Sequence, residues 1–209
     1  MLFLDAEQVG RLADAIREPH GPLIYFAAYT GLRAGEIGAL RMANVDLLHG
    51  VVRVTESLSA VKGDWDFVPP KTNQERSVRL PAFLASMLRE YLGTQPAKGP
   101  GDFLFTGPNG GHLKHGIWYQ RRFRPAVTRA ELPPGLRFHD LRHTCAALMI
   151  ADNAPPKLIC DRLGHSTIQV TMDRYGHLLP SVEEAAISGL DKTFLAAQTT
   201  RALKIVQEG

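Results

Sequence analysis

The chain has 209 residues, of which 44% are hydrophobic, so it can fold around a substantial core as one large domain or two small ones. No apolar run approaches the length needed to cross a bilayer, and no charged-then-apolar leader stands at the start, so we expect a cytoplasmic protein. The net charge is only +3, with a pI of about 9.0, which alone is too weak to indicate a nucleic-acid partner.

The N-terminal part of the chain predicts three helices. Asp5 is placed to cap the first helix, and Gln8 answers it three residues later in the pattern of a capping box. The apolar residues that follow recur at helical spacing and predict one buried face: Val9, Leu12, Ala13 and Ile16. Pro22 opens a second helix that ends at Gly31, and a third short helix covers residues 34–40.

Short β-branched or alternating segments come next, separated by turn residues, and predict a small three-stranded antiparallel sheet. These segments are residues 51–54, 66–68 and 77–80. The turn between the last two carries Lys71, at a position where a lysine is ordinarily a solvated surface residue. Pro81 then starts another helix, which finishes by Gly93.

The second half of the chain is again mainly helical, so the predicted class is α+β and mainly α-helical. Glycine and proline dominate residues 93–111, which we interpret as a surface loop with a brief apolar plug at residues 103–105. A helix kinked at Pro125 is then predicted, with a buried face made of Ile117, Gln120, Phe123 and Val127. Three further helical segments are predicted: residues 139–151, residues 156–163 and a tail over residues 181–207.

The stretch from Leu163 to His177 holds a histidine, His165, and a tyrosine, Tyr175, about one short helix apart, with a glycine beside each. A tyrosine in such a setting can act as a nucleophile when other groups hold an electrophile against it. The alternative is an ordinary buried tyrosine, whose ring packs and whose hydroxyl is hydrogen-bonded.

Arg33 stands where the second predicted helix stops and the third begins. Its guanidinium can therefore point into a cleft beside a helix N-terminus, and both features suit a phosphate oxygen. Glu36, three residues later, can pair with the Arg33 guanidinium and hold it in position. The alternative is that Arg33 and Glu36 form only a capping ion pair.

The segment His-Asp-Leu-Arg-His places His139 and Arg142 on one helix face. An imidazole that titrates near neutral pH, beside a permanent cation, suits phosphate chemistry. One alternative is a structural His139 with Arg142 at the surface. Another is a zinc site, because His139 and His143 are four residues apart as in a zinc-protease motif. A short Asp140 in place of glutamate, a cation between the ligands and no clear third ligand argue against zinc, so we expect no metal.

Basic residues crowd one predicted helical region, with Trp118 and Tyr119 among them. They are Lys114, Arg121, Arg122, Arg124 and Arg129. A run of charges is usually a solvated face, but contacts of this kind with phosphates supply much of a protein's affinity for DNA.

Taken together, these segments resemble the tyrosine recombinase, or phage integrase, family. The matching pieces are Thr-Gly-Leu-Arg-Ala-Gly-Glu around Arg33, Pro-Lys-Thr at Lys71, His-Asp-Leu-Arg-His at His139 and Arg142, Leu-Gly-His at His165, and Asp-Arg-Tyr-Gly-His at Tyr175. They occur in the order of the family, with similar gaps, over residues 1–180. The resemblance implies the mainly helical fold of a DNA breaking and rejoining catalytic domain.

The resemblance also implies a chemistry. Tyr175 would attack a DNA phosphate, giving a 3′-phosphotyrosine link and a free 5′-hydroxyl, and a second strand's 5′-hydroxyl would reverse the step. Arg33, supported by Glu36, and Arg142 would neutralise the non-bridging oxygens in the transition state. This is the chemistry of a site-specific recombinase or integrase.

The remaining catalytic groups implied by the resemblance move protons or hydrogen-bond the phosphate. Lys71 would protonate the leaving 5′-oxygen, His139 would act as general base towards the tyrosine, and His165 would donate a hydrogen bond to the phosphate. No cofactor, metal or ATP is implied, because the covalent link stores the phosphodiester energy.

The expected organisation is a catalytic domain over residues 1–180 and a helical tail over residues 181–209 that docks on a neighbouring protomer. We expect the chain to be an isolated catalytic domain, without the N-terminal DNA-binding domain that family members carry. The expected partner is a double-stranded DNA recombination site, bound as a homotetramer, while the isolated domain can be monomeric. Lys114, Arg121, Arg122 and Arg124 are the expected DNA contacts.

Two alternative functions remain at this stage. A type IB topoisomerase relaxes supercoils through the same kind of phosphotyrosine link, without bringing two DNA partners together. A DNA-binding module that has lost catalysis is the other alternative, and the complete set of polar residues speaks against it.

Overall fold

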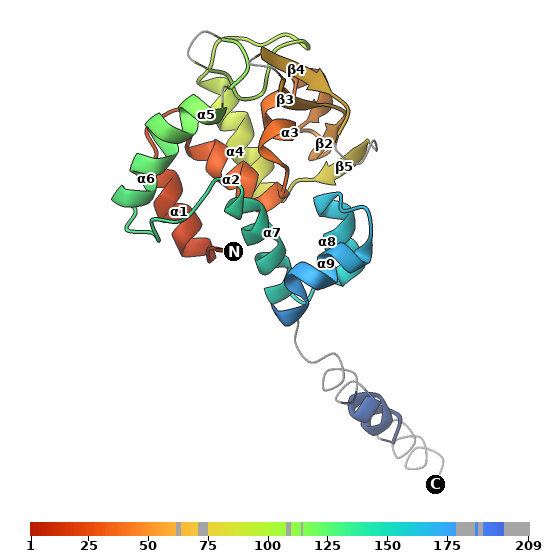
Figure 1. Ribbon diagram of the computed structural model, residues 1–209. Coiled ribbons are helices and arrows are strands. Elements are labelled where there is room, and N and C mark those ends of the chain that lie inside the picture. The colour runs from red at the N-terminus through yellow and green to blue at the C-terminus, as the bar shows by residue number, and fades with distance from the viewer. Residues whose placement is uncertain are drawn as a thin grey trace.

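The computed structural model describes residues 1–61, 64–70, 75–107, 110–113, 115–178, 187 and 190–198. Over these residues the fold is mainly helical with small antiparallel sheets, which confirms the predicted α+β class. In Figure 1 the strands lie at one end of the body. Helix α7 (Asp140–Ala151) separates the pair α8 (Pro156–Leu163) and α9 (Ile168–Tyr175) from α1 (Ala6–Ala15) and α6 (Arg124–Arg129). In this described part of the chain, no helix is long and apolar enough to cross a membrane.

The first helices begin and end where the sequence predicts. In α1 (Ala6–Ala15), the Asp5 carboxylate accepts a hydrogen bond from the backbone N–H of Gln8 at 2.8 Å, and the Gln8 side chain accepts one from the backbone N–H of Asp5 at 2.9 Å. This is the predicted capping box. Helix α2 (Gly21–Thr30) ends at Gly31, whose φ of 70° is left-handed. The turn at Gly31 leads directly into α3 (Ala34–Ala39).

Two small sheets replace the single predicted one. Strands β1 (Val45–Asp46), β2 (Val51–Val54) and β5 (Arg76–Arg79) form a three-stranded antiparallel sheet in the order β1-β2-β5. Residues 51–54 and the predicted segment 77–80 do share one antiparallel sheet. The predicted hairpin between residues 66–68 and 77–80 was wrong, because β5 pairs with β2. The third predicted strand, residues 66–68, lies elsewhere, in β4 (Asp64–Val68), which pairs with β3 (Ser57–Val61) as a separate hairpin. The prediction omitted β3, the neighbour in sequence with which β4 pairs at a small cost in loop-closure entropy.

The predicted helix around Pro125 is built from three pieces. Helix α5 (His115–Trp118) continues into a π-helical turn (Tyr119–Phe123) and then into α6 (Arg124–Arg129). The backbone N–H of Arg124 donates to the Tyr119 carbonyl, five residues back. A proline supplies no N–H to the turn before it, so the wider turn stands where an α-helical hydrogen bond would be lost.

The π-helical turn changes which side chains of this segment are buried. Trp118 and Phe123, five residues apart, both lie in the interior. The predicted buried face was wrong at Ile117, which is 55% exposed, and at Gln120, which is also exposed. A strict 3.6-residue period cannot anticipate the extra residue that a π-helical turn inserts.

The remaining helices agree with the predicted ranges. They are α4 (Ala82–Gly93), α7 (Asp140–Ala151) and α8 (Pro156–Leu163). Helix α9 (Ile168–Tyr175), for which no range was predicted, fills the short-helix spacing noted between His165 and Tyr175. Residues 190–198 are helical, as predicted for the tail, and lie away from the body in Figure 1. In this segment Leu190 and Phe194 are 71% and 62% exposed. Residues 181–186, 188–189 and 199–207 of the predicted tail lie outside the described residues.

Buried apolar side chains form two clusters. The main core joins α1, α2, α4, the three-stranded sheet and residues 104–141, and includes Phe26 packed edge-on against Phe105 with ring centroids 5.3 Å apart. A smaller cluster, the α7–α9 core, is formed by Cys145, Ala146, Ile150, Ile159, Leu163 and Tyr175. The predicted nucleophile is thus part of the smaller cluster, while Arg33 and its helix belong to the main body.

Candidate active site

Arg33 is oriented by Glu36 at the start of α3. Glu36 Oε2 accepts the backbone N–H of Arg33 at 2.8 Å, and Glu36 Oε1 accepts Arg33 Nη1 at 2.9 Å. The capping ion pair is therefore present. Arg33 Nη2 also donates to the Gly164 carbonyl at 3.1 Å, next to His165, and the Arg33 side chain keeps 22% of its surface exposed. The ion pair thus holds Arg33 beside the predicted catalytic histidine rather than away from it.

Arg142 is a buried cation with unused hydrogen-bonding capacity. It is only 2% exposed, and its Nη1 donates to the Gly31 carbonyl at 2.6 Å. Its Nη2 is buried and has no hydrogen-bond partner among the described residues. Burial, followed by the charge of Arg33, lowers the pKa of Arg142 to about 9, which still leaves it charged at neutral pH. A buried N–H donor that lacks a partner is costly, so this arrangement favours an anion at Arg142.

Tyr175 ends α9 with its ring buried, only 1% exposed. Its phenol oxygen lies 2.7 Å from His143 Nδ1. Burial raises the pKa of Tyr175, against smaller opposing effects of the Arg142 and Arg174 charges, so the phenol is protonated at neutral pH. Burial, followed by the neighbouring His139, lowers the pKa of His143 to about 4, so this imidazole is neutral. The phenol therefore donates to Nδ1, and the His143 proton resides on Nε2.

His165 stacks on the ring of Tyr175. Its ring is nearly parallel to that of Tyr175, with centroids 6.3 Å apart and planes 10° apart, and its Nδ1 lies 2.8 Å from the Thr171 hydroxyl oxygen. Burial, followed by the charge of Arg142, lowers the pKa of His165 to about 3, so the ring is neutral. Its Nε2 is buried and has no partner in the described part of the chain. In the tautomer in which the Thr171 hydroxyl donates to Nδ1, Nε2 carries the proton and is a donor awaiting an acceptor.

His139 lies at the N-cap of α7, where its ring meets the edge of the His143 ring at a centroid distance of 5.1 Å. The imidazole that hydrogen-bonds Tyr175 is therefore His143, and the base role predicted for His139 stays a prediction. As for the zinc interpretation, no group of three or more His, Cys, Asp or Glu side chains within the described ranges is placed to hold a metal ion. Lys71 and Lys114 lie outside the described residues.

Three residues at this site were not assigned to it from the sequence: Arg76, His143 and Thr171. Arg76 donates through Nη1 and Nη2 to the two Glu36 carboxylate oxygens, at 3.0 and 2.7 Å. A signal for Arg76 existed, because it shares a strand face with buried Val78, where an arginine needs a partner. His143 was considered only as a zinc ligand, and nothing local distinguished Thr171.

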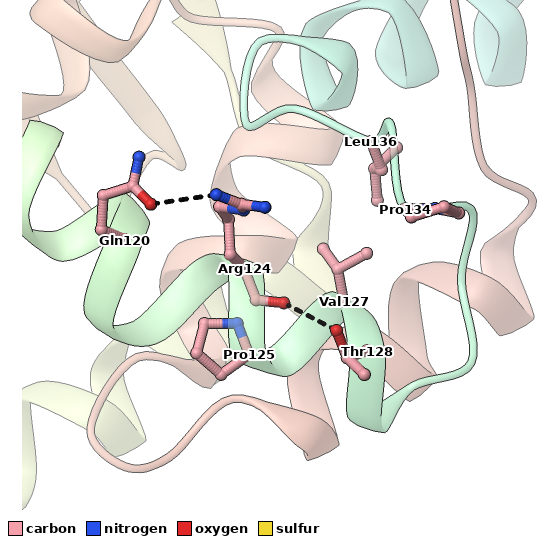
Figure 2. A pocket seen from close by; sticks show the side chains of 7 residues that line it. All are labelled: Gln120, Arg124, Pro125, Val127, Thr128, Pro134 and Leu136. Carbon is pink, nitrogen blue, oxygen red and sulfur yellow. Dashed lines mark hydrogen bonds between the residues drawn. The ribbon is translucent and has the colours of Figure 1, made fainter.

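The basic residues predicted to contact DNA lie on a different part of the molecule. Arg121 is exposed, Arg122 is half-buried, and Arg124 donates to the Gln120 side chain at 3.3 Å. Figure 2 shows Arg124 at a cavity of about 330 Å³ that also borders Pro134. In Figure 1, α5 and α6 lie across α7 from α8 and α9. The fold therefore does not bring these arginines to the cluster around Tyr175, and their contact with DNA stays a prediction.

The residues that come together include four predicted catalytic positions and the predicted support: Arg33, Glu36, Arg142, His165 and Tyr175. His139 lies beside this group through its contact with His143, and Lys71 is outside the described residues. Comparison with known proteins explains this convergence. The phage integrase family model matches residues 2–181. The chain belongs to the phage integrase family.

Similar proteins agree with this family membership. A tyrosine recombinase described as XerC-like, from Caldanaerobacter subterraneus, is 25% identical over 214 residues, covering 90% of this integrase-family chain and 54% of that protein. The chain spans about half the length of the relatives it matches. The catalytic domain of bacteriophage HP1 integrase superposes with a TM-score of 0.63 at 27% identity, covering 90% of this chain and 94% of that one.

The Tn1549 transposon integrase, solved in complex with transposon right end DNA, superposes with a TM-score of 0.74. It is 21% identical and covers 91% of this chain and 65% of that one. At this identity the likeness concerns the fold. It places the mainly helical architecture of the present integrase-family chain among tyrosine recombinase catalytic domains.

Proposed function

We propose that this chain is the catalytic part of a site-specific DNA recombinase that cuts and rejoins strands through a 3′-phosphotyrosine intermediate. The observation that carries the proposal is the grouping of a buried phenol, Tyr175, with donors that lack acceptors in the described chain. These donors are Arg142 Nη2 and His165 Nε2. Together with Arg33, they have the charge and hydrogen-bonding character that a phosphodiester requires.

The proposed step is an in-line displacement at phosphorus. The Tyr175 oxygen forms a bond to phosphorus, its proton leaves to an imidazole, and the bond from phosphorus to the 5′-oxygen breaks. Lys71 gives a proton to that 5′-oxygen, and Arg33 and Arg142 neutralise the charge that gathers on the non-bridging oxygens. Attack by a 5′-hydroxyl of another strand runs the same steps backwards and releases Tyr175.

The hydrogen bond from Tyr175 supports His143 as the immediate acceptor of the phenol proton. His139, the base that the family resemblance implies, contacts His143 and is one ring further from the phenol. His165 donates through Nε2 to a non-bridging oxygen, with Thr171 fixing its tautomer. The step needs no metal ion, because the two guanidinium groups neutralise the phosphate charge that a divalent cation would otherwise neutralise.

The proposed partner is double-stranded DNA, bound by a homotetramer in the cytoplasm in association with the nucleoid. The DNA complex of the Tn1549 integrase, whose fold this chain shares, supports DNA as the ligand. Arg121, Arg122 and Arg124 are proposed to contact the phosphate backbone outside the catalytic cluster. Residues 1–180 form the catalytic unit, and the exposed Leu190 and Phe194 support docking of the tail on a neighbouring protomer.

The proposal is tested with a library of nicked DNA duplexes randomised around the nick, which traps the covalent adduct because the cut strand end diffuses away. We expect a denaturant-stable protein–DNA adduct in the presence of a chelator. Tyr175→Phe abolishes the adduct and retains DNA binding, whereas Tyr25→Phe, a matched change at a half-buried tyrosine of α2, retains both.

Binding of DNA without any adduct from the library would contradict the proposal and favour a DNA-binding module. Relaxation of supercoiled plasmid by a protein that never forms a complex with two DNA partners would instead favour a type IB topoisomerase.

A further inference from the structure

Glu36 is shared by two arginines from distant parts of the chain. Its side chain is fully buried, and each carboxylate oxygen is bonded from both sides. Oε1 accepts Arg33 Nη1 at 2.9 Å and Arg76 Nη1 at 3.0 Å. Oε2 accepts the Arg33 backbone N–H at 2.8 Å and Arg76 Nη2 at 2.7 Å. Arg76 therefore forms a bidentate fork on the same carboxylate that orients Arg33.

The charges in this cluster decide what Arg33 can do. A buried carboxylate paired with Arg33 alone would cancel its charge and make it a poor ligand for a phosphate. Arg76 supplies a second cation, so the three side chains together keep one net positive charge. Burial alone would raise the pKa of Glu36, but hydrogen bonds and charge from Arg76, ahead of those from Arg33, hold this pKa below its ordinary value. The carboxylate is therefore ionised and satisfied mainly by Arg76.

Arg76 itself is enclosed within the protein. Its side chain is 11% exposed, and its Nε donates to the Arg162 carbonyl in α8 at 3.4 Å. A Cβ on Gly164 would lie 2.9 Å from the Arg76 guanidinium, so the loop before His165 passes directly over it. Its charge therefore acts through neighbouring protein groups, in contrast to the partly exposed Arg33.

We propose that Arg76 is a positioning residue for strand cleavage, which frees the positive charge of Arg33 for the phosphate by satisfying Glu36 and supports the loop that carries His165. This inference rests on the proposed recombinase function. Arg76 lies in β5, Glu36 in α3 and Gly164 after α8. One guanidinium therefore connects three elements whose relative positions set the distance between Arg33 and His165.

The test compares adduct formation on the nicked-duplex library by folded protein. Arg76→Met lowers the single-turnover cleavage rate by about 10- to 100-fold, in the range that supporting residues contribute elsewhere. The double variant Arg76→Met with Glu36→Gln recovers at least part of this loss, because it restores one net positive charge to the cluster. Arg79→Met, the same change at an exposed arginine of β5, leaves the rate unchanged.

A purely structural role for Arg76 predicts the opposite pattern, in which removing a second partner from the cluster makes cleavage slower still. That pattern, or an unchanged rate in Arg76→Met, would overturn the inference. If Arg76→Met does not fold, Arg76→Lys keeps the charge without the fork and must cleave more slowly than wild type. An equal rate for Arg76→Lys would likewise overturn the role of the bidentate contact.

A measurement without DNA separates this inference from the function on which it rests. In ¹⁵N-labelled protein, the guanidinium signals of Arg33 shift in Arg76→Met and keep their wild-type positions in Arg79→Met. Absence of adduct in wild type contradicts the recombinase function, whereas unmoved Arg33 signals in Arg76→Met overturn the positioning role.

Discussion

The interior of the main core and the junction that joins the α7–α9 core to it depend on different interactions. The main core contains packed aromatic rings such as Phe26 on Phe105, and the hydrophobic gain from burying them depends on the apolar area removed from water and not on direction. The α7–α9 core is smaller, and it is joined to the main body by arginines that donate to backbone carbonyls. These bonds run from Arg142 to Gly31, from Arg33 to Gly164, from Arg76 to Arg162, and from Arg162 to Tyr29 and Arg79.

Because of this difference, apolar packing contributes most of the stability, and the arginines at the junction contribute the groups proposed for catalysis. Apolar packing fixes the platform regardless of charge, while guanidinium groups at the junction are directional, charged and suited to phosphate oxygens. Two of the arginines in the junction, Arg33 and Arg142, are also the proposed phosphate ligands. The groups proposed for catalysis are thus those that align the two parts of the molecule.

The largest effect is expected from a cavity in the main core. Phe26→Ala removes a fully buried ring and lowers the free energy of unfolding by about 3–5 kcal/mol. Phe83→Ala, at a side chain 44% exposed, costs much less and serves as the control. Urea unfolding followed by circular dichroism measures both, and equal losses in the two variants would contradict the assignment of stability to the main core.

Removing an arginine that joins the α7–α9 core to the main body should reduce the cleavage rate much more than it reduces stability. Arg142→Met lowers the cleavage rate by about 100- to 1,000-fold, the range for loss of one donor to a developing oxyanion. The free energy of unfolding changes little by comparison, because an apolar side chain replaces a buried, incompletely satisfied cation.

The matched control for this prediction is Arg129→Met. Arg129 also donates to a carbonyl, that of Ala15, through Nε at 3.0 Å and Nη2 at 2.7 Å, but at the surface. Rapid-quench assays on the nicked duplexes should show wild-type cleavage for this variant. A large loss there would mean that any arginine–carbonyl bond matters for cleavage, wherever it lies.

The pH dependence of stability should involve both regions. Burial lowers the pKa of His20 in the main body and of His143 in α7 to about 4, below the ordinary value of 6.5. As pH falls below about 6.5 the unfolded chain binds these protons first, so the stability present above that pH is lost towards pH 4. His20→Leu and His143→Leu should each flatten the fall in urea midpoint over this window, and a slope as steep as wild type in both would refute the assignment.

The smallest expected effects concern helix caps. The Asp5 side chain caps α1, and the Thr167 hydroxyl accepts the backbone N–H of Val170 at 3.4 Å to cap α9. Each change to alanine costs about 0.5–2 kcal/mol. Hydrogen exchange should become faster in α9 for Thr167→Ala and in α1 for Asp5→Ala. Faster exchange throughout the chain in the Thr167 variant would show that α9 does not open separately from the main core.

Some features of the fold and of the site could be predicted from local sequence. The capping box at Asp5, the helix end at Gly31 and the ion pair between Arg33 and Glu36 involve residues within a few positions of each other. Dihedral preferences and short-range hydrogen bonds decide such features, so the sequence predicts them directly. The motif residues around Tyr175 were recognisable for the same reason, because each motif is short.

The contacts that assemble the site depend on tertiary structure. The pairing of Tyr175 with His143 spans 32 positions, and that of Arg76 with Glu36 spans 40. No local preference specifies such contacts, and the π-helical turn before Pro125 shifts a face in a way that regular periodicity misses. The sequence by itself determined which elements form and which chemical groups are present. Only the packing of those elements decided which imidazole meets the phenol and which arginine satisfies the carboxylate, since burial and charge pairing are properties of the whole fold.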